Sequence, residues 1–369
     1  MWSPSSPGRP RNCVKTTSYG SVTPVFRLKH YYSPIMNGDT FVVLYNRILD
    51  FTAVFSTIIN VITLTVVLRS TPRSIRNFSK LIVNIIAWNF AANFVCAFGH
   101  PYPMFPAMCF RLDGILSHFK SEIFGHIVIM LLLVTMANVA VGICLSFHFR
   151  YMTISKSSYL SQNPIWGYVY CISAHFSISM AYFVMYYLWA IPVKDYPLQD
   201  ELPDEESLVC FHPSGARKYV IVVLFATCVI LIGVSIVVFL MLSLRRLEEN
   251  RKFMSQQTLM TQKRLLVNLI VLTAIPFLLG GVPLLIVVLT ICLCDWQYTN
   301  AICAVSILIL LNHGPIMCIA TLSIFEHYRL AVKNFVLKTI GKSAKKISQA
   351  KLFSKVSYIS RIDVTKMHS

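Results

Sequence analysis

The residues Asn312-His313-Gly314-Pro315 are followed by an apolar run to Phe325, then by Tyr328-Arg329 and a lysine-rich tail. A helix that leaves a membrane at a Tyr-Arg pair and continues into basic residues ends on the cytoplasmic side, because basic residues collect there. This stretch therefore predicts the orientation of one helix, and with it the topology of the whole chain.

The composition is that of a membrane protein. Of the 369 residues, 56% are hydrophobic and only 13% are charged, whereas charged residues make up about 25% of a soluble domain. The mean hydropathy is +0.63. Lipid is therefore the expected solvent for most of the chain.

Seven windows without Asp, Glu, Lys or Arg are long enough to cross a bilayer core, which takes roughly 20 residues. Lipid offers backbone groups no partner, and the windows lack the alternation of barrel strands, so each predicts a helix. We expect an all-α membrane protein, a seven-transmembrane helix bundle. The predicted spans are Phe51–Leu68, Leu81 to about Pro101, Ile123–Phe149, Ile165–Ile191, Tyr219–Leu244, Leu265–Cys294 and Ala301–Phe325.

The net charge of +18 is distributed unevenly among the loops. Basic residues dominate 69–80, 150–156, 245–264 and the tail. The positive-inside rule therefore predicts an extracellular N-terminus and a cytoplasmic C-terminus, and basic charge placed in this way does not indicate a nucleic-acid partner. The loop at 192–218 is acidic instead, with Asp195, Asp200, Glu201, Asp204, Glu205 and Glu206.

Three parts are expected. Residues 1–50 form an extracellular, largely disordered segment, and 51–325 form the transmembrane domain. Residues 326–369 form a basic cytoplasmic tail, whose start at 330–338 suits a helix on the inner leaflet. The first residues lack the apolar core of a cleavable signal peptide, so the first span directs insertion. A start at Met36 would remove the Ser-, Pro- and Arg-rich opening without touching a span.

Two of the eleven cysteines, Cys109 and Cys210, fall in predicted outer segments and are candidates for a disulfide. Cys294 also lies near the outer surface, so the spacing leaves the pairing open. The sequon Asn77-Phe78-Ser79 falls in a loop assigned to the cytoplasm, where we expect no glycan.

Polar residues in the spans give little support for catalysis. No span contains an acidic or basic residue other than histidine, and no HExxH spacing occurs, so we predict no enzyme activity, no metal and no cofactor. We interpret the histidines as bonded to neighbouring helices; alternatively, His126 or His175 lines a polar cavity. The histidines in or beside the spans are His100, His126, His148, His175 and His313.

Asparagines also recur in the spans, and we interpret them as groups that bond across helices and hold the bundle together. The alternative is a polar network that rearranges on activation, for which Asn312 beside His313 is the best candidate. The asparagines are Asn84, Asn89, Asn93, Asn138, Asn268 and Asn312.

The sixth span carries Ile275-Pro276, Gly280-Gly281 and Pro283, a combination that permits a kink. A kinked helix can pivot, although a kink also occurs in helices without a signalling role. The charged segment before this span, from Arg245 to Lys252, is predicted to extend a helix into the cytoplasm. Its charges are either solvated or available to a cytoplasmic partner.

Five motifs follow one another over about residues 50–330. They are Ser70-Thr71-Pro72 with Lys80-Leu81, then Pro101-Tyr102-Pro103-Met104-Phe105-Pro106 with Gly114, then Gln262-Lys263, then Ile275-Pro276 with Pro283, and finally His313-Gly314, fourteen residues before Tyr328. In this order they resemble the nematode serpentine chemoreceptors, most closely serpentine receptor class H. That family consists of seven-helix receptors regarded as G-protein coupled.

One motif departs from that pattern. Where the family tends to show Phe-Glu-Asn-Arg at the end of the third helix, this chain has Phe147-His148-Phe149-Arg150-Tyr151. Arg150 is in place, but His148 replaces the acid, so an arginine–carboxylate pair within this helix is not expected. The positive-inside rule alone would also place an arginine at this boundary.

The resemblance implies a chemosensory receptor for a small extracellular molecule, which binds between the outer halves of the helices and activates a heterotrimeric G protein. The ligand residues stay unknown. Candidates that face the G protein are Arg150, Tyr151, Arg245 and Arg246. The conformational motif comprises Pro276, Pro283, Asn312, His313, Gly314, Tyr328 and Arg329.

Odorants, pheromones and other metabolites all fit as ligands. We expect a multi-pass protein of the plasma membrane, with the sensory cilium as one candidate location. A ligand-gated channel or transporter is the alternative, but the sequence shows no pore ring and only one strongly interrupted helix. A structural or chaperoning membrane protein is the third hypothesis.

Overall fold

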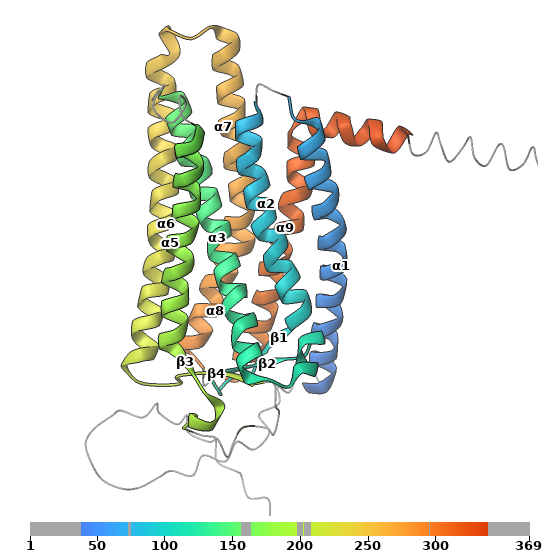
Figure 1. Cartoon of the computed structure of the whole chain (residues 1–369), viewed down its shortest axis with the longest axis vertical. Helices are drawn as coiled ribbons and strands as arrows, with labels where there is room; N and C mark the ends of the chain where they lie inside the picture. Colours follow the sequence, from blue (N-terminus) through green and yellow to red (C-terminus); the bar gives the residue numbers. More distant parts are fainter. Residues whose placement is uncertain are drawn as a thin grey trace, which may run out of the picture. The chain divides into compact units, whose positions relative to one another are not determined.

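The computed structural model describes residues 38–72, 75–155, 164–197, 202, 208–294 and 296–338. Within these ranges seven helical segments are long and apolar enough to cross a membrane, which confirms the predicted bundle (Figure 1). They are α1 (Gly38–Ser70), α2 (Arg76–Gly99), α3 (Glu122–Ile154), α5 (Pro164–Trp189), α6 (Ala216–Glu249), the pair α7 (Gln256–Pro276) and α8 (Val282–Cys292), and α9 (Thr299–Ile324).

Several helices are longer than their apolar windows. Helix α1 begins at Gly38 rather than Phe51, because Arg47 and Asp50 end the charge-free window but not the helix. The predicted N-terminal segment is therefore helical from Gly38 onward, which corrects the expectation of disorder for that part. Helices α6 and α7 likewise run past the predicted spans, to Glu249 and from Gln256, as the charged segment between them suggested.

A four-stranded antiparallel sheet lies across one end of the bundle, and the all-α prediction did not include it (Figure 1). The strands are β1 (Pro101–Pro103), β2 (Cys109–Leu112), β3 (Ala190–Ile191) and β4 (Leu208–Phe211), in the order β1-β2-β4-β3. We call this end the sheet end. At the opposite end, the tail end, α9 is followed by a further helix at 326–338 that turns away from it.

Some predicted features lie outside the described residues. These are the N-terminal residues up to 37, the carboxylates Asp200, Glu201, Asp204, Glu205 and Glu206, and the tail lysines Lys342, Lys345, Lys346, Lys351 and Lys355.

Helix α3 is central, since it packs against α2, α5 and α6. Apolar side chains form two main clusters along the bundle. The sheet-end core includes Trp189, Phe211 and Leu311, and the tail-end core includes Phe147 and Leu272. Most of the outward-facing side chains of α6 are exposed and apolar, as lipid contact requires.

Candidate functional site

A polar layer separates the two cores. On α2, Asn89 and Asn93 are buried between Ile86 of the tail-end core and Cys96 of the sheet-end core. On α3, Asn138 is buried in the corresponding position. Asn89 Nδ2 donates to Ile85 O of its own helix at 3.2 Å, and its Oδ1 has no partner among the described residues. Bonds between helices in this layer therefore come from other polar groups.

Three helices meet in this layer through His175 of α5. Asn84 Nδ2 of α2 donates to His175 Nε2 at 3.0 Å, and His175 Nδ1 donates to Asn138 Oδ1 of α3 at 2.6 Å. Asn138 Nδ2 in turn donates to Ser179 Oγ at 2.9 Å. Every donor has an acceptor when the imidazole is neutral and carries its proton on Nδ1. Asn84, Asn138 and His175 thus bond across helices.

The sixth span is interrupted at the same depth. Helix α7 ends at Pro276, a π-helical turn, η6, occupies Phe277–Gly281, and α8 begins at Val282 with Pro283 in its first turn. Proline removes a backbone donor, and π-helical turns relax the regular ladder, so this is the softest point of the span. A Cβ added to Gly280 would lie 3.6 Å from Cγ of His313, which shows that η6 packs on that ring.

The residues beside His313 face other helices. A Cβ on Gly314 would lie 2.9 Å from Asn93 Nδ2, so α9 approaches α2 closely at this point. Asn312 Nδ2 donates to Leu308 O at 2.8 Å and reaches Thr52 Oγ1 of α1 at 3.5 Å. The motif Asn312-His313-Gly314 therefore contacts α1, η6 and α2 in turn, and its Asn and His side chains point to different neighbours.

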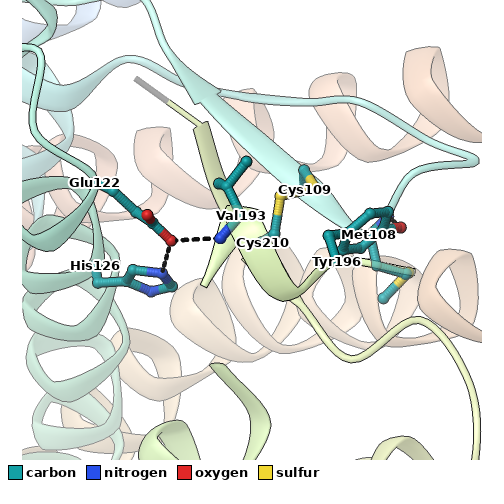
Figure 2. Close-up of a disulfide and its surroundings, with 7 residues drawn as sticks. All are labelled: Met108, Cys109, Glu122, His126, Val193, Tyr196 and Cys210. Atoms are coloured by element: carbon teal, nitrogen blue, oxygen red, sulfur yellow. Dashed lines mark hydrogen bonds and ion pairs between the residues drawn. A yellow bond between two sulfur atoms is a disulfide. The ribbon is translucent and has the colours of Figure 1, made fainter. Parts of the chain in front are cut away.

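The sheet is joined covalently at its centre. Cys109 of β2 lies opposite Cys210 of β4, and their sulfur atoms form a disulfide with an S–S distance of 2.06 Å across 101 residues of chain (Figure 2). Glu122, in the first turn of α3, accepts a hydrogen bond from the backbone of Val193 at 2.7 Å and lies 3.7 Å from His126 Nε2. These contacts hold the sheet and the segment after β3 against α3.

His126 links the sheet to the interior of the bundle. Its Nδ1 lies 2.7 Å from the hydroxyl of Tyr186 on α5. Tyr186 and Trp189 both pack on Phe211 of β4, with ring centroids 5.5 and 4.4 Å apart. A movement of these aromatic rings would therefore displace β4 and the start of α3.

Beneath these aromatic rings lies a cavity of about 80 Å³. It is lined by residues of α3, α5, α6 and α8, and its walls are apolar except for two tyrosines and a tryptophan. The lining residues include Leu133, Tyr182, Trp189, Phe225, Leu284 and Ile291. An apolar cavity with a few polar groups, placed among helices, is the usual form of a small-molecule site.

Charged groups gather at another corner of the sheet end. Asp113 accepts from Arg111 Nε at 2.5 Å and from Asn46 Nδ2 at 3.0 Å. His100, the left-handed C-cap of α2, lies 3.6 Å from Asp50. Burial lowers the pKa of His100, although the nearby carboxylates of Asp50 and Asp113 act to raise it. Within the described ranges no three His, Cys, Asp or Glu side chains are grouped to bind a metal.

At the tail end, Arg150 links α3 to α7. Its side chain is 5% exposed, and Nη2 donates to the backbone carbonyl of Gln262 on α7 at 2.6 Å. Nε of Arg150 and Oε1 of Gln262 are buried without partners, and no carboxylate of the described chain lies within ion-pair distance. A buried guanidinium with one hydrogen bond is poorly compensated, so this link between α3 and α7 is weak.

The other tail-end candidates surround this point. Arg246 pairs with Glu249 at 2.7 Å and also interacts with Tyr151. Arg245 is exposed. The structure therefore brings Tyr151 and Arg246 together and leaves Arg245 facing solvent.

The sequence profile described as serpentine type 7TM GPCR chemoreceptor Srh matches residues 43–338. That range contains six of the seven spans in full and all but the first residues of α1, and it reaches both ends of the bundle. The chain belongs to the Srh chemoreceptor family. No curated protein matches the chain in a sequence search.

In this Srh chemoreceptor the sequence motifs meet in pairs. Tyr328 is fully buried, and its hydroxyl lies 2.8 Å from Ser79 Oγ and 3.0 Å from Thr71 Oγ1. The Thr-Pro motif after α1 thus touches the Tyr-Arg motif after α9. Arg329 is exposed. His313-Gly314 meets the interrupted sixth span in the same way, through Gly280.

Tyr328→Phe is expected to destabilise the Srh receptor by about 1–2 kcal/mol, because Thr71 and Ser79 lose a buried partner but keep their own contact at 2.9 Å. The thermal midpoint of the purified protein measures this. Tyr187→Phe is the control, since Tyr187 is 76% exposed. Equal midpoints for the two variants would mean that the three hydroxyl groups do not hold the tail end.

Several residues of the site were not singled out from the sequence. Trp189 was not singled out because it lies at a span end, where aromatic residues are common. Tyr182 and Tyr186 stand in an aromatic stretch of α5 without distinctive spacing. Only the junction of four helices brings them to one cavity, and single-span patterns do not show such a junction.

Proposed function

We propose that this Srh receptor detects a small extracellular molecule at the sheet end and activates a heterotrimeric G protein at the tail end, in the plasma membrane. The observation that carries the proposal is Arg150, a buried cation held by one backbone hydrogen bond across α3 and α7. A group that is weakly held in one arrangement and ready to bind a partner in another is what a switch requires.

The proposed orientation has the N-terminus and the sheet outside. A disulfide at the sheet end fits an oxidising compartment. Described basic residues outnumber acidic ones at the tail end, as the positive-inside rule requires of a cytoplasmic face. They are Arg69, Arg76, Lys80, Arg150, Arg245, Arg246, Arg251, Lys252, Lys263, Arg264, Arg329, Lys333 and Lys338, against Glu248, Glu249 and Glu326.

Glycosylation tests this orientation. Glu205→Asn creates the sequon Asn-Glu-Ser between β3 and β4, and we expect it to carry a glycan that an endoglycosidase removes, seen as a gel shift. The wild-type protein, with Asn77 as its sequon, is expected to show none. A glycan on Asn77, or none on Glu205→Asn, would place the sheet end in the cytoplasm. Adding Asn77→Gln to the Glu205→Asn chain is the control and should leave the shift unchanged.

The proposed mechanism is a shift between two arrangements of the same bundle. Ligand contacts at the sheet end favour one packing of the polar layer, and η6 lets α7 move while α8 stays on α9. Movement of α7 breaks the link from Arg150 to Gln262 and opens the tail end. A shift from 1:99 to 99:1 needs about 5.5 kcal/mol of differential binding energy, shared between ligand and G protein.

Nucleotide exchange tests the function. The full chain in lipid nanodiscs is mixed with purified G-protein heterotrimers and a broad panel of small molecules, and GTPγS uptake is recorded. We expect at least one heterotrimer to exchange faster with one class of molecule. Ion current or solute flux without any G protein would favour a channel or transporter, and no exchange with any heterotrimer would reject the proposal.

A further inference from the structure

The cavity beneath the sheet changes in character from its deep part to its rim. Its deep part is lined by Leu133, Phe225 and Leu284, which lie farther from the helix ends at the sheet. Its rim is formed by Trp189, the last residue of α5, by Ile221 near the start of α6 and by Ile291 near the end of α8. The site therefore has an apolar floor, and any polar recognition takes place at the rim.

One polar group of the rim lacks a partner. Trp189 is 9% exposed and lines the cavity. Its Nε1 is buried and has no hydrogen-bond acceptor in the chain as described. A buried indole N–H normally donates to an acceptor, and leaving it unmade has a free-energy cost. A ligand with an acceptor oxygen at the rim would remove that cost.

A second polar group, a cation, lies one helical turn beyond the rim. Lys218 lies in the first turn of α6, three residues before Ile221, so the two share one helix face. It is 7% exposed. Its Nζ lies 3.8 Å from Sγ of Cys294, which follows the end of α8 three residues after Ile291. Lys218 and Cys294 do not line the cavity themselves, but their contact lies about one helical turn from the rim residues Ile221 and Ile291, on the side of the sheet.

Nothing described in the chain neutralises Lys218. No carboxylate of the described ranges lies within ion-pair distance of Nζ, and a thiol is a weak acceptor. Buried lysines are almost always paired with an anion. The first turn of a helix also favours negative charge, so a cation there adds to the demand. An anionic group of a ligand would pair with the ammonium group of Lys218. It would also place negative charge at the first turn of α6, where it is favoured.

The volume limits the apolar part of such a ligand. A dry cavity of about 150 Å³ takes a benzene molecule, which has six carbon atoms. By the same ratio, the 80 Å³ beneath the sheet takes about three or four non-hydrogen atoms. A chain of three carbon atoms beyond a carboxyl group fits this limit.

We propose that the cavity binds a short-chain monocarboxylate of about four carbon atoms, whose apolar chain lies among Leu133, Phe225 and Leu284 and whose carboxylate meets Lys218 and Trp189 at the rim. This rests on the proposed function only in taking the cavity as the receptor's ligand site. The tyrosine hydroxyls are secondary, since that of Tyr186 already contacts His126.

Binding is tested first, without a G protein. The thermal midpoint of the full chain in nanodiscs is recorded with butanoate, 2-methylpropanoate, decanoate, methyl butanoate and 2-pentanone. We expect concentration-dependent stabilisation by the two short acids, and none by the neutral compounds or by decanoate, which is too long. Stabilisation by the ester and the ketone at the same concentrations as the acids would overturn the assignment of an anion.

Substitutions locate the site. Lys218→Met is expected to weaken butanoate binding about 30-fold or more, because a charge-assisted hydrogen bond is lost. Trp189→Phe keeps a ring but loses the donor, and should weaken binding about 5-fold to 10-fold. Lys194→Met, at an exposed lysine of the same end, is the matched control and should change nothing. Less than a twofold change with Lys218→Met would reject the proposed rim site.

A variant that fills the cavity covers the case in which Lys218→Met fails to fold. Val287→Phe places a ring in the cavity wall and should abolish butanoate binding while raising the thermal midpoint or leaving it unchanged. Unaltered binding in Val287→Phe would overturn the proposal. Butanoate that binds without stimulating nucleotide exchange would contradict the proposed function alone. Exchange stimulated by other compounds, with no acid binding, would contradict the monocarboxylate alone.

Discussion

Gly114→Ala is expected to abolish folded receptor. A Cβ at this position would lie 2.3 Å from the carbonyl oxygen of Phe98, 2.8 Å from its carbonyl carbon and 2.9 Å from that of Gly99. All three are backbone atoms at the end of α2, and the Gly114 N–H donates to Gly99 O at 3.1 Å. Because no side chain can move aside, the sheet segment must separate from α2, at a cost of about 3 kcal/mol or more.

The cause is space and not backbone conformation. Gly114 has φ −80°, which any residue adopts. Surface expression and the thermal midpoint measure the effect. Gly233→Ala is the matched control, because a Cβ there meets nothing within 4 Å, and the same change within a helix should be neutral or slightly stabilising. Normal expression of Gly114→Ala would mean that this contact between sheet and bundle does not limit folding.

The seven spans could be predicted from the sequence because lipid imposes one requirement on every spanning segment. Backbone groups must bond within the segment, and charges must be absent. Helix ends could not be predicted in this way, since helices such as α1 continue past the lipid through Arg47 and Asp50. The length of a charge-free window therefore reflects the thickness of the lipid core and not the length of the helix.

The sheet escaped prediction for another reason. Strands β1 to β4 are two to four residues long, and their pairing joins segments on either side of α3 and α5. Such short strands carry no periodic signal, and contacts between distant segments do not show in a single sequence. The disulfide follows from this pairing, because Cys109 and Cys210 lie opposite each other in the sheet. Spacing alone had left Cys294 as an alternative.

For the polar residues, the need for partners could be predicted from the sequence, but the partners could not. Asn84, Asn138 and His175 could be identified separately as groups needing partners across helices, but the bonds that join them depend on helix rotation. For His313 the partner is η6, whose π-helical turn accompanies Pro276 and Pro283. The proline and glycine pattern therefore gives the position of the interruption, and the packing of α9 gives its neighbour.

Arg150→Met is expected to leave the receptor folded and silent. Replacing a buried, poorly compensated cation by an apolar side chain of similar length costs one hydrogen bond to Gln262 O but removes the penalty of the buried charge. We therefore expect the free energy of unfolding of Arg150→Met to be at most about 1 kcal/mol below that of the wild type, or to exceed it. If Arg150 binds the G protein, ligand-stimulated nucleotide exchange should fall at least about 10-fold.

These two measurements separate a functional arginine from a structural one. An arginine needed for folding would lower the thermal midpoint when replaced, and activity would fall only in proportion to the folded fraction. Arg150→Lys keeps a charge without the planar fork of donors and should retain intermediate activity. Arg251→Met is the control, since Arg251 is exposed and pairs with Glu248 at 3.1 Å, an interaction worth at most about 1 kcal/mol.

Ligand binding decides the remaining alternative. If Arg150 acts only at the tail end, the affinity for ligand without G protein should be close to that of wild type. A large gain of ligand affinity in Arg150→Met would mean that the link to Gln262 itself sets the balance between the two arrangements, because its loss favours the open one. Full signalling by the folded variant would show that α3 and α7 separate without any need for this cation, and the switch would then have to lie in the contact of η6 with His313.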